Sequence, residues 1–483
     1  MSEHFDVCVI GGGPAGYHAA IRAAQLGLHV ACVDAGFLGM ASTPTLGGTC
    51  LRVGCIPSKA LLDSSKRYWD LKHTIAAHGI EIGEATLNLA TMLERKDAIV
   101  QHLTAGIAAL FKANKVTSLF GTARLFPHNR VHIISQDGQR RQLHATNVIL
   151  AAGSRPVTIP AVPINGQTIV DSSGALAFNA VPRHLAVIGA GSIGLELGSV
   201  WRRLGAQVTL LDQSPQLLAA ADRDVATLAE RELSKQGIVF QLGASVRSAQ
   251  VQLATNTPQV SLAFDNSAGE QTLVADKVLV AVGRQPATEN LLGEGCEVQR
   301  DEQGHIVVDA HCHTGVEGVW AIGDCVRGPK LAHKGFEEGI AVAELIAGLP
   351  GHVNLATLPW VVYTEPELAW VGESEQSLAQ QGIPYNTGTF PFSANGRAVA
   401  LGEPSGFIKI LAHRTTDRVL GMHCVGPHAS ELIHEGVLTL EFKGAADDLA
   451  RICHAHPSLA EAIHDAAMAI DQRAIHSPNR TKR

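Results

Sequence analysis

One pattern occurs twice in this chain and constrains its fold more than any other feature. It consists of a short apolar strand, a turn with the spacing Gly-x-Gly-x-x-Gly, a helix, and a second strand that ends in aspartate. The glycines allow a tight turn, the approach of a pyrophosphate to the backbone and the packing of helix on strand, and the carboxylate can accept hydrogen bonds from a ribose hydroxyl. Two copies therefore predict two dinucleotide sites. The residues are Gly11, Gly13, Gly16 and Asp34 in the first copy, and Gly189, Gly191, Gly194 and Asp212 in the second.

The second copy also indicates which dinucleotide it binds. An NADP site needs Arg or Lys close to the ribose 2′ position, where the extra phosphate lies. Asp212 is followed by no cation before Arg223, so the sequence favours NAD. The predicted elements are strand 6–10, helix 17–26 and strand 29–33 in the first copy, and strand 185–188, helix 195–204 and strand 207–211 in the second.

Length and composition narrow the class of protein. With 483 residues the chain is too long for one hydrophobic core, and 48 glycines with 17% charged residues indicate an α/β protein. The net charge of −7 excludes a nucleic-acid partner. A first strand close to Met1, and the lack of any run of about 20 apolar residues, predict no membrane partner and a soluble, cytoplasmic protein.

Two buried strands that end in a glycine turn, 148–153 and 278–283, mark domain edges. From about residue 359 onward, alternating apolar and polar segments predict an antiparallel sheet with helices. We therefore expect an α/β fold with two Rossmann-like three-layer domains and an α+β C-terminal domain. The expected units are 1–155, 156–281, a segment 282–355, the third domain 356–475, and a solvated basic tail 476–483.

Cys50 and Cys55 form the candidate redox centre. On an ideal helix their Cα atoms would be about 8–9 Å apart, whereas a disulfide requires about 4.4–6.8 Å. Gly54 loosens the backbone and Pro57 lacks a hydrogen-bond donor, so we expect an irregular first turn of a helix that continues through Lys59. A helix N-terminus lowers the pKa of a thiol. The alternatives are two inert cysteines or a metal site, but partner ligands are absent nearby and no metal is predicted.

A thiol reaction needs a base, and the segment 453–461 offers one. Pro457 restricts the residue before it, His456, and Glu461 can hold the second ring nitrogen and raise the basicity of the imidazole. Composition alone does not separate His456 from the other histidines of the chain.

Four segments together resemble the class I flavoprotein disulfide reductases. Residues 47–59 are similar to the redox-disulfide signature of that family, 314–324 to its second flavin motif, and 454–461 to its acid/base motif, and 363–367 also matches. The resemblance implies FAD on the first nucleotide unit and NAD on the second, with 282–355 completing the flavin domain and 356–475 forming a dimerisation domain. It also implies a homodimer in which His456 serves the cysteines of the partner subunit.

Residues 327–334 resemble the branch of the family that oxidises protein-bound dihydrolipoamide. The implied partners are the lipoyl domains of a 2-oxo acid dehydrogenase or glycine-cleavage complex. Cys50 is then the interchange sulfur, Cys55 lies nearer the flavin, Lys59 lies at the flavin N5 region, and Asp324 binds a ribityl hydroxyl. The further FAD residues implied are Gly48, Thr49, Gly121, Ala123, Ala152, Gly153, Ser154, Leu331, Ala332 and His333, and the further NAD residues are Ser192, Ile193, Glu196 and Gly283.

The chain departs from the family pattern in places. Asp34 and Asp212 stand where glutamate is usual, and the segment 35–46 is expected to be a flexible loop near the adenosine end of the flavin. Glutathione and trypanothione reductases use NADPH, and mercuric reductase needs a cysteine pair that the chain lacks after Cys453. Soluble transhydrogenase is disfavoured by the intact cysteine pair. A noncatalytic flavoprotein docking subunit remains the alternative of a different class.

Overall fold

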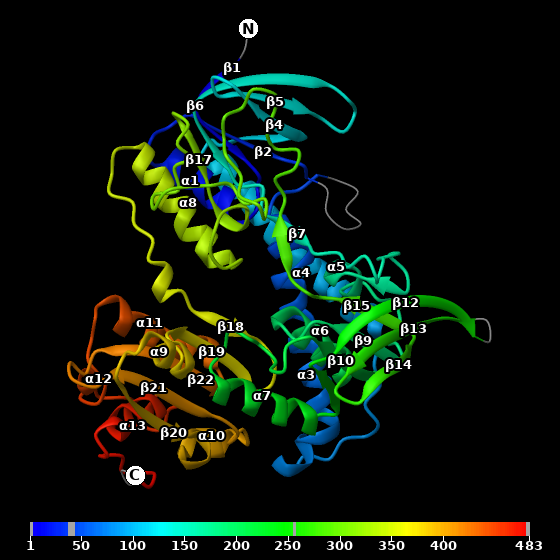
Figure 1. Ribbon diagram of the computed structural model, residues 1–483, viewed down its shortest axis with the longest axis vertical. Helices are drawn as coiled ribbons and strands as arrows, with labels where there is room; N and C mark the ends of the chain where they lie inside the picture. Colours follow the sequence, from blue (N-terminus) through cyan, green and yellow to red (C-terminus); the bar gives the residue numbers. More distant parts are fainter. Residues whose placement is uncertain (1–2, 37–43, 255–256, 480–483) are drawn as a thin grey trace.

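A computed structural model of the chain describes residues 3–36, 44–254 and 257–479 (Figure 1). Residues 37–43 of the expected loop and 480–483 of the expected tail lie outside the described residues. Figure 1 shows three bodies, with a first sheet at the top, a second at the lower right and a third at the lower left.

The first sheet joins the beginning of the chain to a strand that follows the second nucleotide unit. Its order is β3-β2-β1-β6-β5-β4, and β17 pairs with β6 in parallel. The hairpin β4–β5 joins this otherwise parallel core in antiparallel fashion. The strands are β1 (Glu3–Ile10), β2 (Val30–Asp34), β3 (Thr117–Phe120), β4 (Thr122–Phe126), β5 (Arg130–Ile134), β6 (Arg140–Leu150) and β17 (Val319–Ala321).

Two helices pack closely beside the first sheet, α1 (Pro14–Gln25) and α8 (Ala332–Ile346). Glycine on α8 makes this contact possible, because a Cβ atom on Gly339 would lie 2.5 Å from the carbonyl oxygen of Ala15. The residues that follow the second nucleotide unit thus complete the first domain in space.

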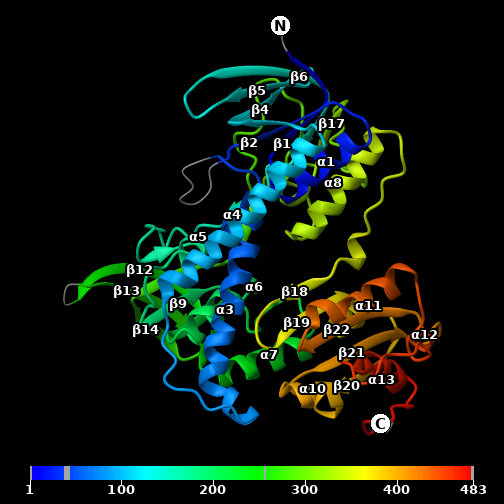
Figure 2. The same ribbon diagram turned by 180° about the vertical axis from the view of Figure 1, so that it is seen from behind.

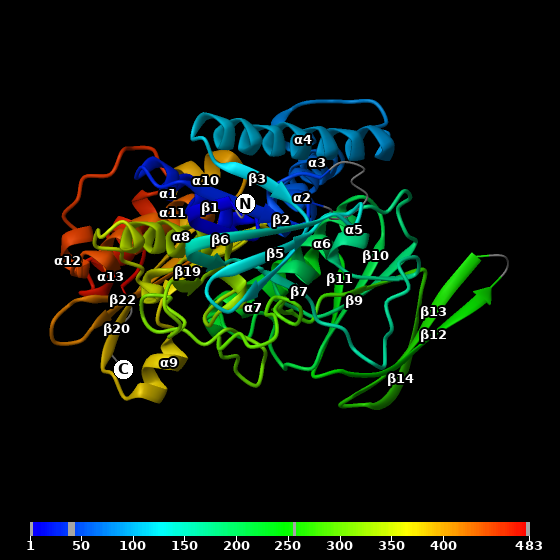
Figure 3. The ribbon, with the colours of Figure 1, turned by 90° about the horizontal axis from the view of Figure 1, so that it is seen from above.

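The second sheet is parallel, in the order β11-β10-β9-β15-β8. A three-stranded antiparallel sheet, β12-β13-β14, belongs to the same part of the chain, and its β12–β13 hairpin projects to one side of the molecule (Figure 3). The strands are β8 (Ile169–Val170), β9 (His184–Ile188), β10 (Gln207–Asp212), β11 (Ile238–Leu242), β12 (Ser245–Ala254), β13 (Thr257–Asn266), β14 (Gly269–Ala275) and β15 (Lys277–Val280).

The third sheet is antiparallel, in the order β18-β19-β22-β21-β20, and carries α11 (Ala429–Glu441) and α13 (Glu461–Ile470). The chain passes between the first two domains twice, and the two connecting segments pair with each other as the short strands β7 (Ser154–Pro156) and β16 (Arg284–Pro286). The sheet strands are β18 (Trp360–Val362), β19 (Glu367–Gly372), β20 (Tyr385–Pro391), β21 (Phe407–His413) and β22 (Val419–Gly426).

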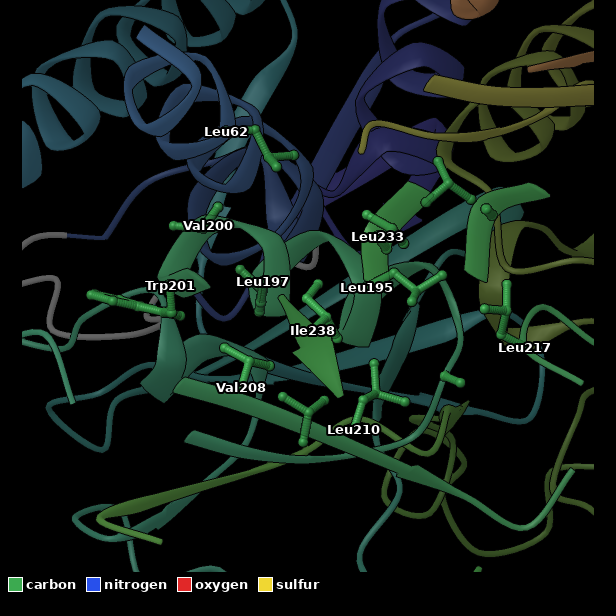
Figure 4. Packing of buried hydrophobic residues seen from close by; sticks show 14 of the residues in the cluster. Leu62, Leu195, Leu197, Val200, Trp201, Val208, Leu210, Leu217, Leu233 and Ile238 are labelled. Atoms are coloured by element: carbon green, nitrogen blue, oxygen red, sulfur yellow. The ribbon is translucent and has the colours of Figure 1, made fainter. Parts of the chain in front are cut away.

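Two long antiparallel helices connect the first domain to the second. Seen from behind, α4 extends from the first sheet toward the second, beside α3 (Figure 2). Leu62 of α3 belongs to the same buried cluster as Leu195, Val200 and Trp201 of α6, so the helix that begins at Cys55 packs into the second domain's core (Figure 4). The remaining helices are α2 (Gly48–Val53), α3 (Cys55–His73), α4 (Leu89–Ala113), α5 (Ser172–Ala175), α6 (Ser192–Arg203), α7 (Arg223–Lys235), α9 (Glu375–Gln381), α10 (Gly396–Leu401) and α12 (Ala446–Leu449).

The predicted fold class is confirmed, although β1 begins at Glu3 rather than at residue 6, and both helices of the nucleotide units also begin earlier than predicted. The two helices begin at Pro14 and Ser192, three residues before the predicted starts at 17 and 195. The reason is local, since Gly13 and Gly191 have extended backbone angles and act as N-caps. None of the described helices is long and apolar enough to span a membrane. Within the described ranges, no group of three or more His, Cys, Asp or Glu residues could hold a metal ion.

Candidate active site

Both glycine turns have a conformation that excludes a side chain. Gly11 and Gly189 each have φ of +113°, and a Cβ atom would lie 2.1 Å from the carbonyl oxygen of Ala151 and 2.4 Å from that of Ala281, respectively. The helices that follow begin without a side-chain cap. Their first N–H groups therefore have no side-chain acceptor at the turn, and a pyrophosphate at this position would satisfy them. Both turns fit a dinucleotide.

The aspartate that closes each unit supports its turn. Asp34 accepts hydrogen bonds from the N–H groups of Gly12 at 2.6 Å and Gly36 at 2.7 Å. Asp212 forms the equivalent bonds with Ala190 at 2.6 Å and Ser214 at 2.7 Å. A carboxylate has about four acceptor positions, so each aspartate keeps capacity for a ribose hydroxyl.

The second unit opens into a pocket of about 280 Å³. No lysine or arginine is among the described residues that line it, which agrees with the predicted preference for NAD. Two predicted NAD residues lie elsewhere: Gly194 packs against the carbonyl of Gly189, and Glu196 accepts a hydrogen bond from Lys59 of α3. The lining residues are Gly189, Ala190, Gly191, Ser192, Ile193, Asp212, Ser214, Gln216, Leu218, Ala219, Ala281, Val282 and Gly283.

The redox segment, residues 47–59, lies directly on the first glycine turn. The N–H of Gly47 donates to the carbonyl of Gly12 at 2.9 Å. A Cβ atom on Gly48 would lie 2.5 Å from the Cα of Gly13, so only two glycines can approach this closely. The predicted residues Gly48 and Thr49 therefore begin α2 beside the expected pyrophosphate position.

The local structure around the cysteines differs from the expected irregular turn. Two helices are present: Cys50 lies within α2, and Cys55 is the first residue of α3. Gly54 breaks the helix between them with φ of −141° and ψ of −116°. A Cβ atom there would lie 2.8 Å from the carbonyl oxygen of Thr49, so the break requires glycine. The bend brings the two sulfur atoms into hydrogen-bonding contact.

The pKa values of the two thiols are shifted in opposite directions. Both cysteines are present as thiols that are not joined in a disulfide. The hydrogen bond from the Cys50 thiol lowers the pKa of Cys55, and Lys59 lowers it further. The same hydrogen bond and burial raise the pKa of Cys50. When one of the two thiols loses its proton, the negative charge is therefore favoured on Cys55 rather than on Cys50.

Lys59 is held by residues of two other domains. Its Nζ lies 2.7 Å from Oε2 of Glu196 and 4.5 Å from the centre of the Tyr363 ring. The other carboxylate oxygen of Glu196 accepts the N–H of Tyr363 at 3.1 Å. Glu196, predicted for NAD, thus joins the second domain to α3. Tyr363 was recognised only as part of a family motif, and no local signal in the sequence predicts its stacking on Lys59.

We expect Lys59→Met to raise the pKa of Cys55 in the reduced protein. Loss of the cation removes a favourable interaction with the thiolate and leaves Glu196 uncompensated, and both changes disfavour the anion. The pH dependence of alkylation by iodoacetamide, followed at Cys55 by mass spectrometry, should therefore shift to higher pH. Lys66→Met, on the same helix but paired with Asp70 and Glu403, is the control and should leave it unchanged. A midpoint that stays in place in Lys59→Met contradicts the assigned role.

Ser154 and Asp324, both predicted flavin residues, are in contact. The Ser154 hydroxyl donates to the Asp324 carboxylate. Arg284 in turn donates to the Ser154 hydroxyl at 2.7 Å and to its carbonyl at 2.6 Å. Burial lowers the pKa of Arg284, while Asp324 and Cys55 oppose that change. Arg284 was not among the predicted site residues. The feature of the sequence that could have indicated it is its position directly after the Gly283 turn.

The other predicted flavin residues are spread over several elements. Leu331 and Ala332 form the start of α8, and His333 contacts the carbonyl of Pro359 through Nε2 at 2.9 Å. Gly121 links β3 to β4 and donates to the carbonyl of Asp34 at 2.9 Å. The Ala123 side chain packs into a hydrophobic cluster under the first sheet. Ala152 and Gly153 follow the end of β6.

His456 and Glu461 form the predicted pair. Nδ1 of His456 lies 2.8 Å from Oε1 of Glu461, and Oε2 of Glu461 accepts the N–H of Ser458 at 2.8 Å. The carboxylate at the first turn of α13 is thereby fixed, and Nε2 of His456 faces outward on a side chain that is 79% exposed. In the part of the chain that the structure describes, neither residue forms a hydrogen bond with the redox segment 47–59.

Comparison with known proteins identifies the family. Residues 5–339 match the model of the pyridine nucleotide-disulphide oxidoreductases, and residues 358–467 match the dimerisation domain of these proteins. The chain belongs to this family. A dihydrolipoyl dehydrogenase of Cupriavidus necator is 48% identical over 98% of this chain and 100% of its own length. Dihydrolipoyl dehydrogenase 3 of Pseudomonas putida is 47% identical over 98% of this chain and 99% of its own.

Solved structures agree with that membership. LpdA from Mycobacterium tuberculosis matches with a TM-score of 0.86 and 25% identity, covering 96% of this chain and 99% of that one. As a family member with these relatives, the chain is a flavoprotein disulfide oxidoreductase that uses FAD and NAD, which confirms the predicted enzyme class and cofactors.

Proposed function

We propose that this enzyme oxidises protein-bound dihydrolipoamide to lipoamide through the Cys50–Cys55 pair, with NAD as the final electron acceptor. The observation that carries the proposal is a pair of neighbouring thiols on a segment packed against the first nucleotide turn, in which the pKa of Cys55 is lowered and that of Cys50 is raised. The relatives at 44–48% identity named dihydrolipoyl dehydrogenase support the choice of substrate.

The exchange begins with the pair oxidised to a disulfide. Nε2 of His456 takes a proton from one substrate thiol, because Glu461 holds Nδ1. The resulting thiolate attacks Sγ of Cys50, a mixed disulfide forms, and the Cys50–Cys55 bond breaks with its electron pair on Cys55. The second substrate thiol then attacks the substrate sulfur of the mixed disulfide. Lipoamide leaves, and Cys50 receives the proton.

The substrate has then lost two electrons and two protons, and the enzyme holds a Cys50 thiol beside a Cys55 thiolate. This product is the charge distribution that the hydrogen bond and Lys59 favour. When bound, FAD would supply a two-electron acceptor for the reduced cysteine pair, and NAD would be the final electron acceptor. The first unit, with Gly11, Gly13, Gly16, Asp34, Ser154 and Asp324, would hold FAD, and the pocket of the second unit would hold NAD.

Bringing His456 to Cys50 requires a second subunit. His456 is exposed and forms no hydrogen bond to segment 47–59 among the described residues, whereas the domain that carries it matches a dimerisation domain. Large apolar side chains on that domain are exposed, among them Leu438, Phe442 at 80% and Ile452. A homodimer would bury such side chains. In this proposal His456 of one subunit serves Cys50 of the other.

We further propose that the partners are the lipoyl domains of a 2-oxo acid dehydrogenase or glycine-cleavage complex. We also propose a cytoplasmic location, because the reducing conditions there suit a catalytic dithiol.

Anaerobic mixing of the FAD-loaded enzyme with dihydrolipoamide tests the function. We expect the flavin absorbance to bleach, and NAD to restore it. A flavin that dihydrolipoamide leaves oxidised, while NADH still reduces it, contradicts the substrate and favours a noncatalytic docking role.

A further inference from the structure

Gly323, the residue before Asp324, is held by two buried charged side chains of α8. Its N–H donates to Oε2 of Glu338 at 2.7 Å, and its carbonyl accepts from Nζ of Lys334 at 3.0 Å. Lys334 also donates to Oε2 of Glu338 at 3.0 Å. The two side chains are only 1% and 2% exposed. One ion pair therefore fixes both polar groups of a single residue, and we call this pair the α8 clamp.

The clamp is not explained by stability alone. Burial raises the pKa of Glu338 above its ordinary value even though Lys334 lies beside it, so burial disfavours the carboxylate more than its partners stabilise it. Buried ion pairs are often replaceable by apolar residues without loss of stability, because desolvation opposes their attraction. The hydrogen bonds from the pair to Gly323 point to a positioning role.

What the pair holds is the backbone that carries Asp324. Gly323 has φ of +76°, a left-handed conformation, and a Cβ atom there would lie 3.0 Å from the Cβ of Ala15 on α1. On its side-chain end, Asp324 is oriented by the Ser154 hydroxyl, which Arg284 orients in turn. Asp324 is thus fixed from both ends: by the clamp through its backbone, and by Ser154 through its carboxylate.

We propose that Lys334 and Glu338 are positioning residues for FAD, which hold Gly323 so that Asp324 presents its carboxylate to a ribityl hydroxyl. The inference rests on the proposed function insofar as the first unit takes FAD, and it adds two buried residues whose role is to hold the backbone of Gly323. The clamp lies on α8, whose packing on α1 also sets the position of the first glycine turn. Removing the clamp should therefore weaken the binding of FAD and change the environment of the bound flavin.

The test is the affinity of the full-length apoprotein for FAD, measured by the quenching of flavin fluorescence. Glu338→Gln leaves Lys334 buried without a counter-charge and weakens the bond to Gly323, so the Kd for FAD should rise about 10–100-fold. The double variant Lys334→Met/Glu338→Gln removes both charges and is expected to fold, with a smaller rise in Kd. The visible circular dichroism of the bound flavin should change in Glu338→Gln, and in the same direction as it should change in Asp324→Asn.

Lys409→Met is a matched control, because Lys409 is an equally buried lysine, 1% exposed, paired with Asp222 between the second and third domains. It should reduce thermal stability but leave the FAD affinity and the flavin dichroism at their wild-type values. Wild-type FAD affinity in Glu338→Gln, or an equal loss in Lys409→Met, overturns the clamp. If the variants behave as expected but dihydrolipoamide fails to reduce wild-type flavin, the positioning role of the clamp is supported and the proposed substrate is contradicted.

Discussion

Cys50→Ser should abolish the oxidation of dihydrolipoamide while the protein keeps its flavin. Serine cannot form the disulfide that the substrate thiolate attacks, so turnover should fall by at least about 10⁴-fold, to background. FAD binding should persist because the contacts of the redox segment with the first glycine turn are made by Gly47 and Gly48. Steady-state NAD reduction with dihydrolipoamide, and the flavin-to-protein absorbance ratio, provide the two measurements.

Cys296→Ser is the matched control for this substitution. Cys296 is also an unpaired, partly exposed cysteine, but it packs at the edge of a hydrophobic cluster under the first sheet. Its replacement should leave turnover close to wild type. Loss of the flavin in Cys50→Ser, or turnover that survives there, would remove Cys50 from its role as the interchange sulfur.

His456→Gln should slow the thiol step by about 10²–10⁴-fold, the usual contribution of a general base. Glutamine retains the size and one hydrogen bond to Glu461 but cannot accept the proton of a substrate thiol. Rapid-mixing measurement of flavin reduction by dihydrolipoamide isolates this step. Reduction of the same flavin by NADH bypasses the thiol exchange and should keep its wild-type rate.

An exposed histidine–glutamate pair elsewhere in the chain is the control. His352 is 74% exposed and lies 3.5 Å from Glu441, so His352→Gln makes the same chemical change outside the proposed site. It should have little effect on the rate of flavin reduction by dihydrolipoamide.

Mixing Cys50→Ser and His456→Gln subunits then tests the shared site: random exchange should restore about a quarter of wild-type turnover if each site uses two subunits. Mixtures that remain inactive would place base and disulfide in the same chain.

Much of the fold follows from short segments of sequence. The two strand–turn–helix units were predictable because their signals are local: left-handed glycines at Gly11 and Gly189, and an aspartate at a set distance. The helix starts were misjudged by three residues because an extended glycine N-cap leaves no side-chain signal. The 25-residue helix α4 and the β12–β14 sheet were not anticipated, since neither carries a motif.

The sequence by itself determined the chemistry available: two nucleotide turns, a cysteine pair broken by glycine, and a histidine five residues before a glutamate. These are patterns between neighbours, and the backbone conformations they require are set by φ and ψ preferences of single residues. The tertiary structure alone decided that Glu196 faces Lys59, that Arg284 orients Ser154, and that Glu338 holds Gly323. Contacts between different elements depend on how whole domains pack, and no local preference encodes which side chain a distant element will meet.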